Sequence, residues 1–410
     1  MILKPHQINA VQQAAPILRK KGLVYIFGQP RVGKSLIALE LYKQNPPKTQ
    51  GRCIVFTKKN AIADWQKYTP FYDFDVINYE QVTKCDPNAY NLVIIDEAHN
   101  FSAFPRPTQR IRDFCKFCAG KPLIYLSGTP FVESPNAAYS QFCLSSYSPF
   151  RHFKNAYAYF RAHGTPDLVW VSGEQIESYK KGVLPPIVND YIVKVTYEDA
   201  GFKYQNTDII HTLTSPRIEE ILYGAVKTRI ASDDYDIKHW EARDGREGNY
   251  YTPAGQEYPL ENIPALMQFL HRACGGFYED LTLPQEKLRW LLNFTQNSGK
   301  TAIMCYFRQE QEQIAQEFAK NPRVSVFSST KYCEGIDLSD FDTYILYSFG
   351  YSGAKFIQLR DRIVNLNKDK ATQVHIPLIA NTIDADIYER VSQKLNYNNF
   401  MIFERYGREH

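Results

Sequence analysis

Near the start of the chain, four residues are spaced as in loops that hold the phosphates of a nucleotide. Gly28, Gly33, Lys34 and Ser35 fit the pattern G-x-x-x-x-G-K-S. In this pattern, loop amides and a helix N-terminus cradle the phosphates, the lysine reaches the β- and γ-phosphates, and the hydroxyl ligates Mg²⁺. We therefore expect the two glycines, Lys34 and Ser35 to bind a nucleotide, Ser35 to ligate the metal, and Lys34 to take part in catalysis.

Two adjacent acids supply the other half of such a site. Asp96 and Glu97 follow the apolar run 92–95, which predicts a buried strand that ends at these acids, where open α/β sheets bind ligands. Asp96 is expected to hold the Mg²⁺ shared with Ser35, and Glu97 to orient or deprotonate the attacking water. An exposed acidic pair at a strand end is the simpler alternative, but a nearby phosphate loop argues against it.

Other polar positions support less specific predictions. The Gln7 amide could pair with an adenine edge, although a glutamine at a helix N-terminus is an ordinary surface residue. Thr57 and Lys58 end a predicted strand, where they could hold a nucleic-acid backbone or simply solvate the strand end. Thr129 is a further candidate nucleic-acid contact; its hydroxyl could instead sense the γ-phosphate or turn the chain.

The elements that must position these residues have an α/β pattern. Residues 23–27 predict a buried parallel strand, and the apolar spacing after Ser35 predicts a helix. A second parallel sheet, without a phosphate loop of its own, is predicted from later apolar runs. These runs are residues 301–307, 323–329, 343–349 and 372–380.

Length and composition narrow the class of protein. A chain of 410 residues is longer than a single hydrophobic core usually supports, so two or three domains are expected. The 44% hydrophobic and 22% charged content excludes a largely disordered chain, and no apolar segment is long enough to span a membrane. A polar N-terminus and eight irregularly spaced cysteines predict a cytoplasmic location. The net charge of +4 is too small to argue nucleic-acid binding by itself.

Residues 131–262 differ in composition from the rest of the chain, because they contain many tyrosines and phenylalanines. Basic and aromatic residues between 151 and 161 could clamp a nucleic-acid strand, but an amphipathic helix with aromatic core contacts explains them equally well. Cys115 and Cys118 form a lone C-x-x-C in a predicted helix. Without a second pair, we interpret them as buried thiols rather than zinc ligands.

A series of short motifs follows a definite order along the chain: KPHQ, GQPRVGKS, IVFTKKNAIADW, INYEQV, IIDEAHNF, LSGTPF, TAIMCYF, EGIDLSDF, QLRDR and IANTIDADIYERVSQK. This series resembles the superfamily 2 helicases and translocases, most closely their SWI/SNF-type branch. Two further segments, VTYEDAGF and ENIPALMQFLHRACGGFYED, also resemble compact DEAH-box DNA helicases encoded by bacteriophages.

This resemblance implies two RecA-like lobes, with lobe one over 1–150, an aromatic-rich connecting insertion over 151–262, and lobe two over 263–410. It implies ATP and Mg²⁺ as cofactors, and ATP hydrolysis coupled to movement on DNA, whether duplex, forked or single-stranded. The setting would be phage replication, recombination or repair in the host bacterial cytoplasm, with replication or recombination proteins as possible partners.

For the second lobe, the resemblance places Gly335, Asp337 and Gln358 at the nucleotide and makes Arg362 the arginine finger. Arg362 keeps the family spacing from Gln358, but Asn365 stands where the family has a second arginine. Segments between the first two strands of this lobe are also shorter than usual. Strand unwinding or branch migration, RNA as substrate, and a nucleotide-gated DNA-binding scaffold with weak turnover therefore remain as alternatives.

Overall fold

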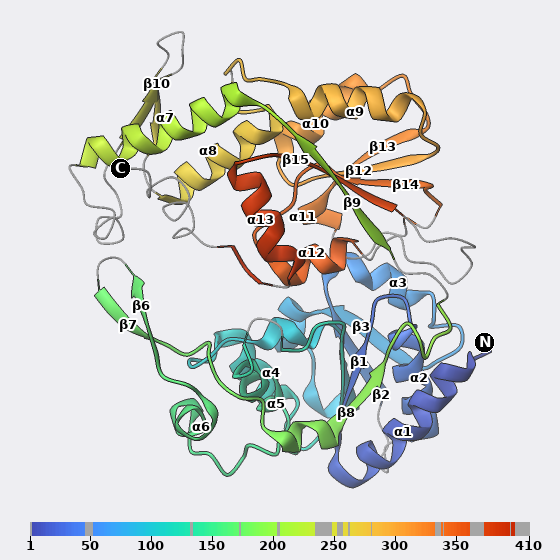
Figure 1. Cartoon of the computed structure of the whole chain (residues 1–410). Helices are drawn as coiled ribbons and strands as arrows, with labels where there is room; N and C mark the ends of the chain where they lie inside the picture. The colour runs from blue at the N-terminus through green and yellow to red at the C-terminus, as the bar shows by residue number, and fades with distance from the viewer. Residues whose placement is uncertain are drawn as a thin grey trace. The chain divides into compact units, whose positions relative to one another are not determined.

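The computed structural model contains two compact units (Figure 1). Lobe 1 comprises Met1–Asp167 and Glu177–Lys203, and lobe 2 comprises Leu168–Ile176, Tyr204–Val364 and Lys368–His410. The residues described are 2–45, 52–131, 134–171, 174–202, 206–233, 248–251, 257–260, 263–279, 281–332, 338, 340–360, 373–393 and 395–397.

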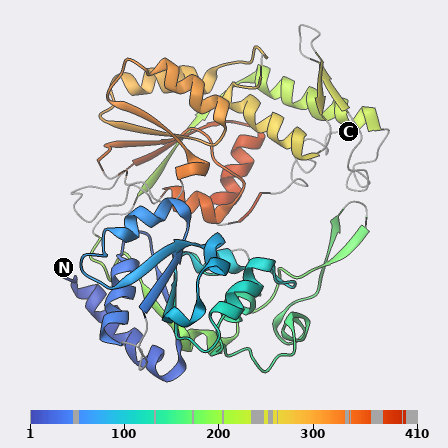
Figure 2. The same ribbon diagram turned by 180° about the vertical axis from the view of Figure 1, so that it is seen from behind.

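Lobe 1 is built on a six-stranded sheet in the order β3-β2-β4-β5-β1-β8, in which every paired strand is parallel (Figures 1 and 2). Its strands are almost continuously apolar, as expected when helices cover both faces. The predicted strand–loop–helix at the phosphate loop is confirmed. The strands are β1 (Leu23–Gly28), β2 (Arg52–Thr57), β3 (Phe74–Asn78), β4 (Tyr90–Ile95), β5 (Leu123–Ser127) and β8 (Ile192–Val195).

Helices cover both faces of this sheet because alternate strand residues point to opposite sides. Leu23 and Tyr25 join a core with Phe114 and Phe142, from helices α4 and α5. Helices α1 and α2 pack together and contact β1, opposite that core. The helices of lobe 1 are α1 (Pro5–Lys21), α2 (Lys34–Gln44), α3 (Ile62–Gln66), α4 (Gln109–Phe117), α5 (Ala137–Phe142) and α6 (Ala156–His163).

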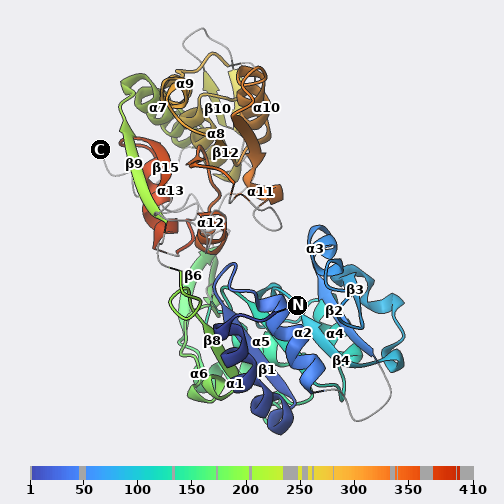
Figure 3. The ribbon, with the colours of Figure 1, turned by 90° about the vertical axis from the view of Figure 1, so that its right-hand side faces the viewer.

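Lobe 2 has a second parallel sheet, of five strands in the order β13-β12-β14-β15-β9. The prediction of two α/β lobes with parallel sheets is therefore confirmed. All four predicted runs form strands, and β9 lies beside β15 at one edge (Figure 3). The strands are β9 (Thr207–Leu213), β12 (Thr301–Cys305), β13 (Val324–Ser328), β14 (Thr343–Leu346) and β15 (Gln373–Ile379).

The helices of lobe 2 are also divided between two apolar cores. One core joins α7, α8, α12 and α13 to one face of the sheet, and the other joins α9 and α10 to the opposite face. No described helix is long and apolar enough to cross a membrane. The helices are α7 (Pro216–Asp233), α8 (Ile263–Gly275), α9 (Glu286–Gln296), α10 (Arg308–Glu317), α11 (Ser329–Tyr332), α12 (Gly353–Arg360) and α13 (Ile383–Ser392).

The division between the lobes differs from the expected boundaries at residues 150 and 262. Within the expected connector, β8 pairs with β1 of lobe 1, and β9 pairs with β15 of lobe 2. Two strands of this region therefore complete the two sheets. Two short strand pairs lie in the remainder: β6 (Asp167–Val171) with β7 (Glu174–Ser178), and β10 (Gly248–Tyr251) with β11 (Glu257–Leu260).

Side chains in and near α6 divide between the core and the surface, and Arg151, His152, Lys154, Tyr157 and Arg161 are exposed. Tyr159 is fully buried, and its ring centroid lies 4.9 Å from those of Tyr139 and Phe150. Cys118 is likewise buried, as expected for a structural thiol, and burial raises its pKa. Among the described residues, no group of three or more histidines, cysteines or acids could hold a metal ion.

A buried ionic cluster joins two helices of lobe 2. Lys287 on α9 donates a hydrogen bond of 3.0 Å from Nζ to Oδ2 of Asp384 on α13, and the two side chains are 1% and 0% exposed. The amide of Ile379 also donates to Asp384 Oδ2, at 3.2 Å. His271 Nε2 lies 3.7 Å from Asp384 Oδ1, and burial lowers the pKa of this histidine to about 3. Lys287 is therefore the cation that balances the buried carboxylate.

Candidate nucleotide-binding and hydrolytic site

The candidate site forms where four strands of lobe 1 end. Because β1, β2, β4 and β5 are parallel, their carboxyl ends meet at one edge of the sheet, where open α/β sheets bind ligands. Gly28, Thr57 and Ser127 are the last residues of β1, β2 and β5, and Asp96 directly follows β4. The sheet thus gathers the phosphate loop and the acidic pair at the same edge.

The loop after β1 has the geometry that the glycine pattern predicts. Gly33 caps α2 in a left-handed conformation, with φ 84°, which favours glycine. A Cβ atom at Gly33 would lie 2.1 Å from Nε2 of Gln7. Lys34 begins α2 and donates from Nζ to the carbonyl oxygens of Gly28, at 2.8 Å, and Gln29, at 3.2 Å. The lysine therefore spans the loop, and Ser35 lies beside it in the first helical turn.

Gln7 lies against this loop but already uses its amide within the protein. Its Oε1 accepts a hydrogen bond of 2.9 Å from the amide of Lys4, which caps α1, and its Nε2 lies 3.5 Å from the carbonyl of Val32. The side chain is buried. Gln7 thus joins α1 to the phosphate loop, and adenine recognition by this residue stays a prediction.

Asp96 is half-buried and held by three donors. Its Oδ2 accepts hydrogen bonds of 2.9 Å from Thr57 Oγ1 and from Trp65 Nε1, and its Oδ1 accepts one of 3.0 Å from the amide of Glu97. Burial and the charge of Glu97 raise the pKa of Asp96, against the effect of these hydrogen bonds. With the Ser35 hydroxyl, this carboxylate provides the oxygen ligands that Mg²⁺ prefers.

Thr57 lies inside this arrangement, and its contact with nucleic acid stays a prediction. Its side chain is only 1% exposed, and its hydroxyl donates to Asp96. Thr57 therefore orients the acidic site. The neighbouring Lys58 is partly exposed, and its charge helps to lower the pKa of Glu97, so Lys58 also lies near the acids while remaining accessible to a ligand.

Glu97 is held in an unusual backbone conformation. Its φ of 47° and ψ of 50° are left-handed, a region that non-glycine residues occupy at some cost and that is common at functional sites. Its Oε2 lies 3.2 Å from Nδ1 of His99. Burial would raise the pKa of Glu97, but His99, with the charges of Lys34 and Lys58, lowers it on balance. The structure therefore keeps this carboxylate ionised.

His99 extends the site to the end of β5. Its Nδ1 lies 2.9 Å from Oγ of Ser127, which in turn accepts a hydrogen bond of 3.0 Å from the amide of Thr129. Gly128, between them, approaches the phosphate loop: a Cβ atom there would lie 3.6 Å from the Gly28 carbonyl oxygen. This chain of contacts links Glu97 to the loop that carries Thr129.

Sequence reasoning assigned no role in the site to Trp65 or His99. The indole of Trp65 donates to Asp96 from a helix 31 residues away in sequence, so no local pattern signals the contact. His99 follows Glu97 by two residues, and that proximity is a signal that could have been used.

The structure describes only one of the site residues predicted for lobe 2. Gln358 lies in α12 and is 8% exposed, whereas Gly335, Asp337, Arg362 and Asn365 lie outside the described residues. Arg360, the nearest described arginine, donates from Nε to Asp208 Oδ1 at 2.6 Å. That ion pair gives Arg360 a structural partner within lobe 2.

Replacing Lys34 by alanine should abolish tight nucleotide binding. The variant removes the cation that spans the loop, and charge-assisted hydrogen bonds of this kind contribute roughly 1.5–3 kcal/mol each. Binding of a fluorescent ATP analogue, followed by anisotropy, measures the change. Lys20→Ala, at an exposed position of α1, is the control; equal affinity for wild type and Lys34→Ala would contradict the assignment.

Comparisons with solved structures show a structural likeness at low sequence identity. No protein-family model matches the chain, and no curated protein matches it either. Among solved structures, the chain is similar to the Sulfolobus solfataricus SWI2/SNF2 ATPase core in complex with dsDNA. That similarity has a TM-score of 0.41 and 15% identity, and it covers 96% of this chain and 91% of that one.

Proposed function

We propose that this protein is an ATP-dependent DNA helicase or translocase. The observation that carries the ATP hydrolase part is the meeting of Lys34, Asp96 and Glu97 at one edge of the lobe 1 sheet. This is the set that phosphoryl transfer requires: a cation for the phosphates, a ligand for Mg²⁺, and a carboxylate for the water.

Each residue has a separate task in the proposed reaction. Lys34 and the loop amides hold the phosphates, while Ser35 and Asp96 would hold Mg²⁺, which neutralises charge on the transferred phosphoryl group. Glu97 acts on the attacking water. Because its pKa is lowered and a weak base abstracts protons poorly near neutral pH, Glu97 chiefly orients the water. His99 lies between Glu97 and Ser127, with its Nδ1 3.2 Å from the Glu97 carboxylate and 2.9 Å from the Ser127 hydroxyl.

DNA as the partner is supported by the order of motifs along the chain and by accessible Lys58 beside the acidic pair. We further propose that the protein acts in phage replication, recombination or repair, in the cytoplasm of the host. Within the protein, Arg362 would serve as the arginine finger. Asn365 stands where the family has a second arginine, and the loss of that charge favours slow ATP turnover. A nucleotide-gated DNA-binding scaffold is therefore the second candidate function.

Lys58→Ala should weaken DNA binding without changing sequence preference. Backbone contacts release counterions, so affinity should fall steeply with salt, and losing one contact should reduce the slope of log K against log salt by about one. Titration of a labelled duplex at several salt concentrations measures the slope, with Lys20→Ala as control. An unchanged slope would remove Lys58 from the DNA site.

Movement on DNA can be tested by measuring whether the protein displaces a bound nucleic-acid strand. A translocase on duplex DNA should release the third strand of a triplex when ATP is present, whereas an unwinding enzyme should separate a fork or junction. RNA duplexes test the RNA alternative. If ATP leaves all these substrates intact while the protein binds DNA, the scaffold interpretation replaces the motor.

A further inference from the structure

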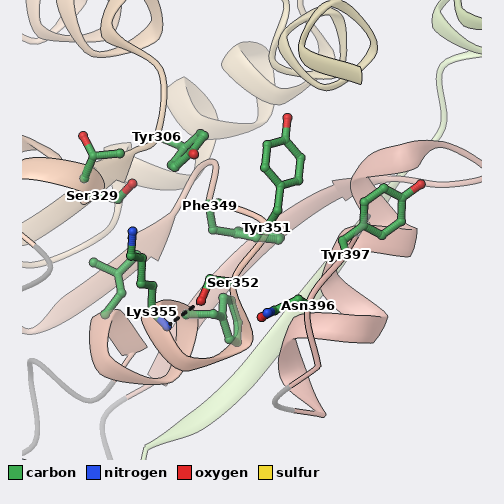
Figure 4. A pocket seen from close by; sticks show the side chains of 12 residues that line it. Tyr306, Ser329, Phe349, Tyr351, Ser352, Lys355, Asn396 and Tyr397 are labelled. Carbon is green, nitrogen blue, oxygen red and sulfur yellow. Dashed lines mark hydrogen bonds between the residues drawn. The ribbon is translucent and has the colours of Figure 1, made fainter. Parts of the chain in front are cut away.

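Lobe 2 contains a pocket that has no part in the hydrolytic site. It has a volume of about 340 Å³, within the range of roughly 300–1,000 Å³ for pockets that hold small organic ligands. It opens where β12, β13 and β14 end, and α12 begins beside it (Figure 4). Its walls therefore come from the carboxyl edge of the sheet, the ligand-binding edge of this class of fold.

Aromatic rings form much of the wall. The ring centroids of Tyr306 and Tyr351 lie 5.9 Å apart at 80°, and those of Tyr351 and Tyr397 lie 6.4 Å apart at 31°. Gly350 makes room for the first of them, because a Cβ atom there would lie 2.6 Å from the Tyr306 ring. Tyr306 is only partly buried and lines the pocket, so part of its ring is accessible to a ligand there.

The polar groups of the pocket favour a ligand with hydrogen-bonding edges and negative charge. The side chain of Ser329 is 5% exposed, and its Oγ is buried without a hydrogen-bond partner. Such a group normally has a partner, because an unsatisfied buried hydroxyl is costly. Lys355 is exposed at the start of α12, and no described lining residue is acidic.

A second hollow continues past Tyr306. Its volume is about 450 Å³, and it shares Tyr306 and Thr330 with the first pocket. Arg308 lies on its wall, with its side chain 88% exposed and paired to Glu312 at 2.7 Å. Tyr306 thus borders both hollows, with Lys355 lining the first and the Arg308–Glu312 pair lining the second. A strand that places a base in the first hollow could place its phosphates near these basic side chains.

We propose that this pocket receives one unpaired base of a DNA strand. The inference deepens the proposed function, on which it rests, because it names single-stranded rather than duplex DNA as the form that lobe 2 holds. The base stacks on Tyr306, as bases do on aromatic platforms in single-strand-binding proteins. Ser329 bonds the edge of the base, and the flanking phosphates face Lys355 and Arg308.

The test uses single strands of thymidines that carry one 2-aminopurine, whose fluorescence is quenched when the base stacks on a ring. Binding is measured without ATP, so the result does not depend on hydrolysis. Wild type should quench the probe. Tyr306→Ala should bind the strand roughly 5- to 150-fold more weakly, the loss expected for one stacked base, while Tyr306→Phe should keep both affinity and quenching.

Two further variants test the polar contacts. Lys355→Ala should weaken binding of the strand and make it less sensitive to salt. Lys320→Ala is the matched control, because Lys320 is an exposed lysine of the same lobe outside the pocket. Ser329→Ala should reduce affinity while leaving quenching, since the stacked ring is untouched.

The outcomes separate the possible ligands. Equal affinity and quenching for wild type and Tyr306→Ala would overturn the proposal, even if DNA still stimulates ATP hydrolysis. Equal affinity for the single strand and for the same sequence in a duplex, without quenching, would also overturn it. Competition by thymidine monophosphate at the concentration of the strand would assign the pocket to a free nucleotide instead. If no DNA binds to any variant, the proposed function itself fails.

Discussion

Glu97→Gln should bind ATP as wild type does and hydrolyse it at least about 100-fold more slowly, because the attacking water is no longer held in position by a charged group. Glutamine keeps the shape of the side chain but loses the negative charge that lies 3.2 Å from His99 and is expected to orient the attacking water. Lys34 and Asp96 remain, so affinity for the nucleotide is preserved. Phosphate release under steady-state conditions gives the rate, and anisotropy of labelled ATP gives the affinity.

Glu80→Gln is the matched control, because Glu80 lies in the same lobe but its side chain is 68% exposed and pairs with Arg110. It should hydrolyse ATP at the wild-type rate. Comparable rates for wild type and Glu97→Gln would show that another group acts on the water. A loss of ATP binding in Glu97→Gln would mean that Glu97 contributes to nucleotide binding rather than to the hydrolysis step.

Lys287→Ala should lower the free energy of unfolding of lobe 2 by about 3–5 kcal/mol, because removing one partner of a buried ion pair leaves an uncompensated charge. The stranded group is Asp384, which is 0% exposed. Urea denaturation followed by circular dichroism measures the loss. The control is Arg289→Ala on the same helix, whose pair with Glu286 is as short, at 2.8 Å, but whose side chain is 67% exposed.

For that exposed pair, a loss of at most about 1 kcal/mol is expected. The double variant Lys287→Met with Asp384→Leu should recover part of the stability, since neither charge is then buried alone. Equal losses for Lys287→Ala and Arg289→Ala would show that burial does not determine the strength of these pairs.

The fold could largely be predicted because most strands are apolar runs that only a buried sheet explains. The exceptions are β8 and β9, which complete the sheets from the middle of the chain. β8 has four residues, and β9 alternates between exposed and partly buried residues. Short or half-exposed edge strands carry a weak apolar signal, and their pairing with β1 and β15 depends on the whole sheet.

The candidate site was predictable where neighbouring residues carry the chemistry, as in the phosphate loop and the acidic pair. It was not predictable where distant elements meet. Thr57 and Trp65 both donate to Asp96, and only the parallel order of β2 and β4 brings them there. The same limit applies to Gln7: its adenine contact stays a prediction, and only the fold shows that its side chain fills the space beside Gly33.

Steady-state ATP hydrolysis, with and without DNA, tests the central claim most directly. The assay compares wild type and Glu97→Gln in the presence of Mg²⁺, with single-stranded DNA, duplex DNA, RNA or no nucleic acid. The proposed function predicts hydrolysis by wild type that DNA stimulates and that Glu97→Gln loses. Hydrolysis that no nucleic acid changes, or that is absent from wild type while ATP and DNA both bind, would contradict it.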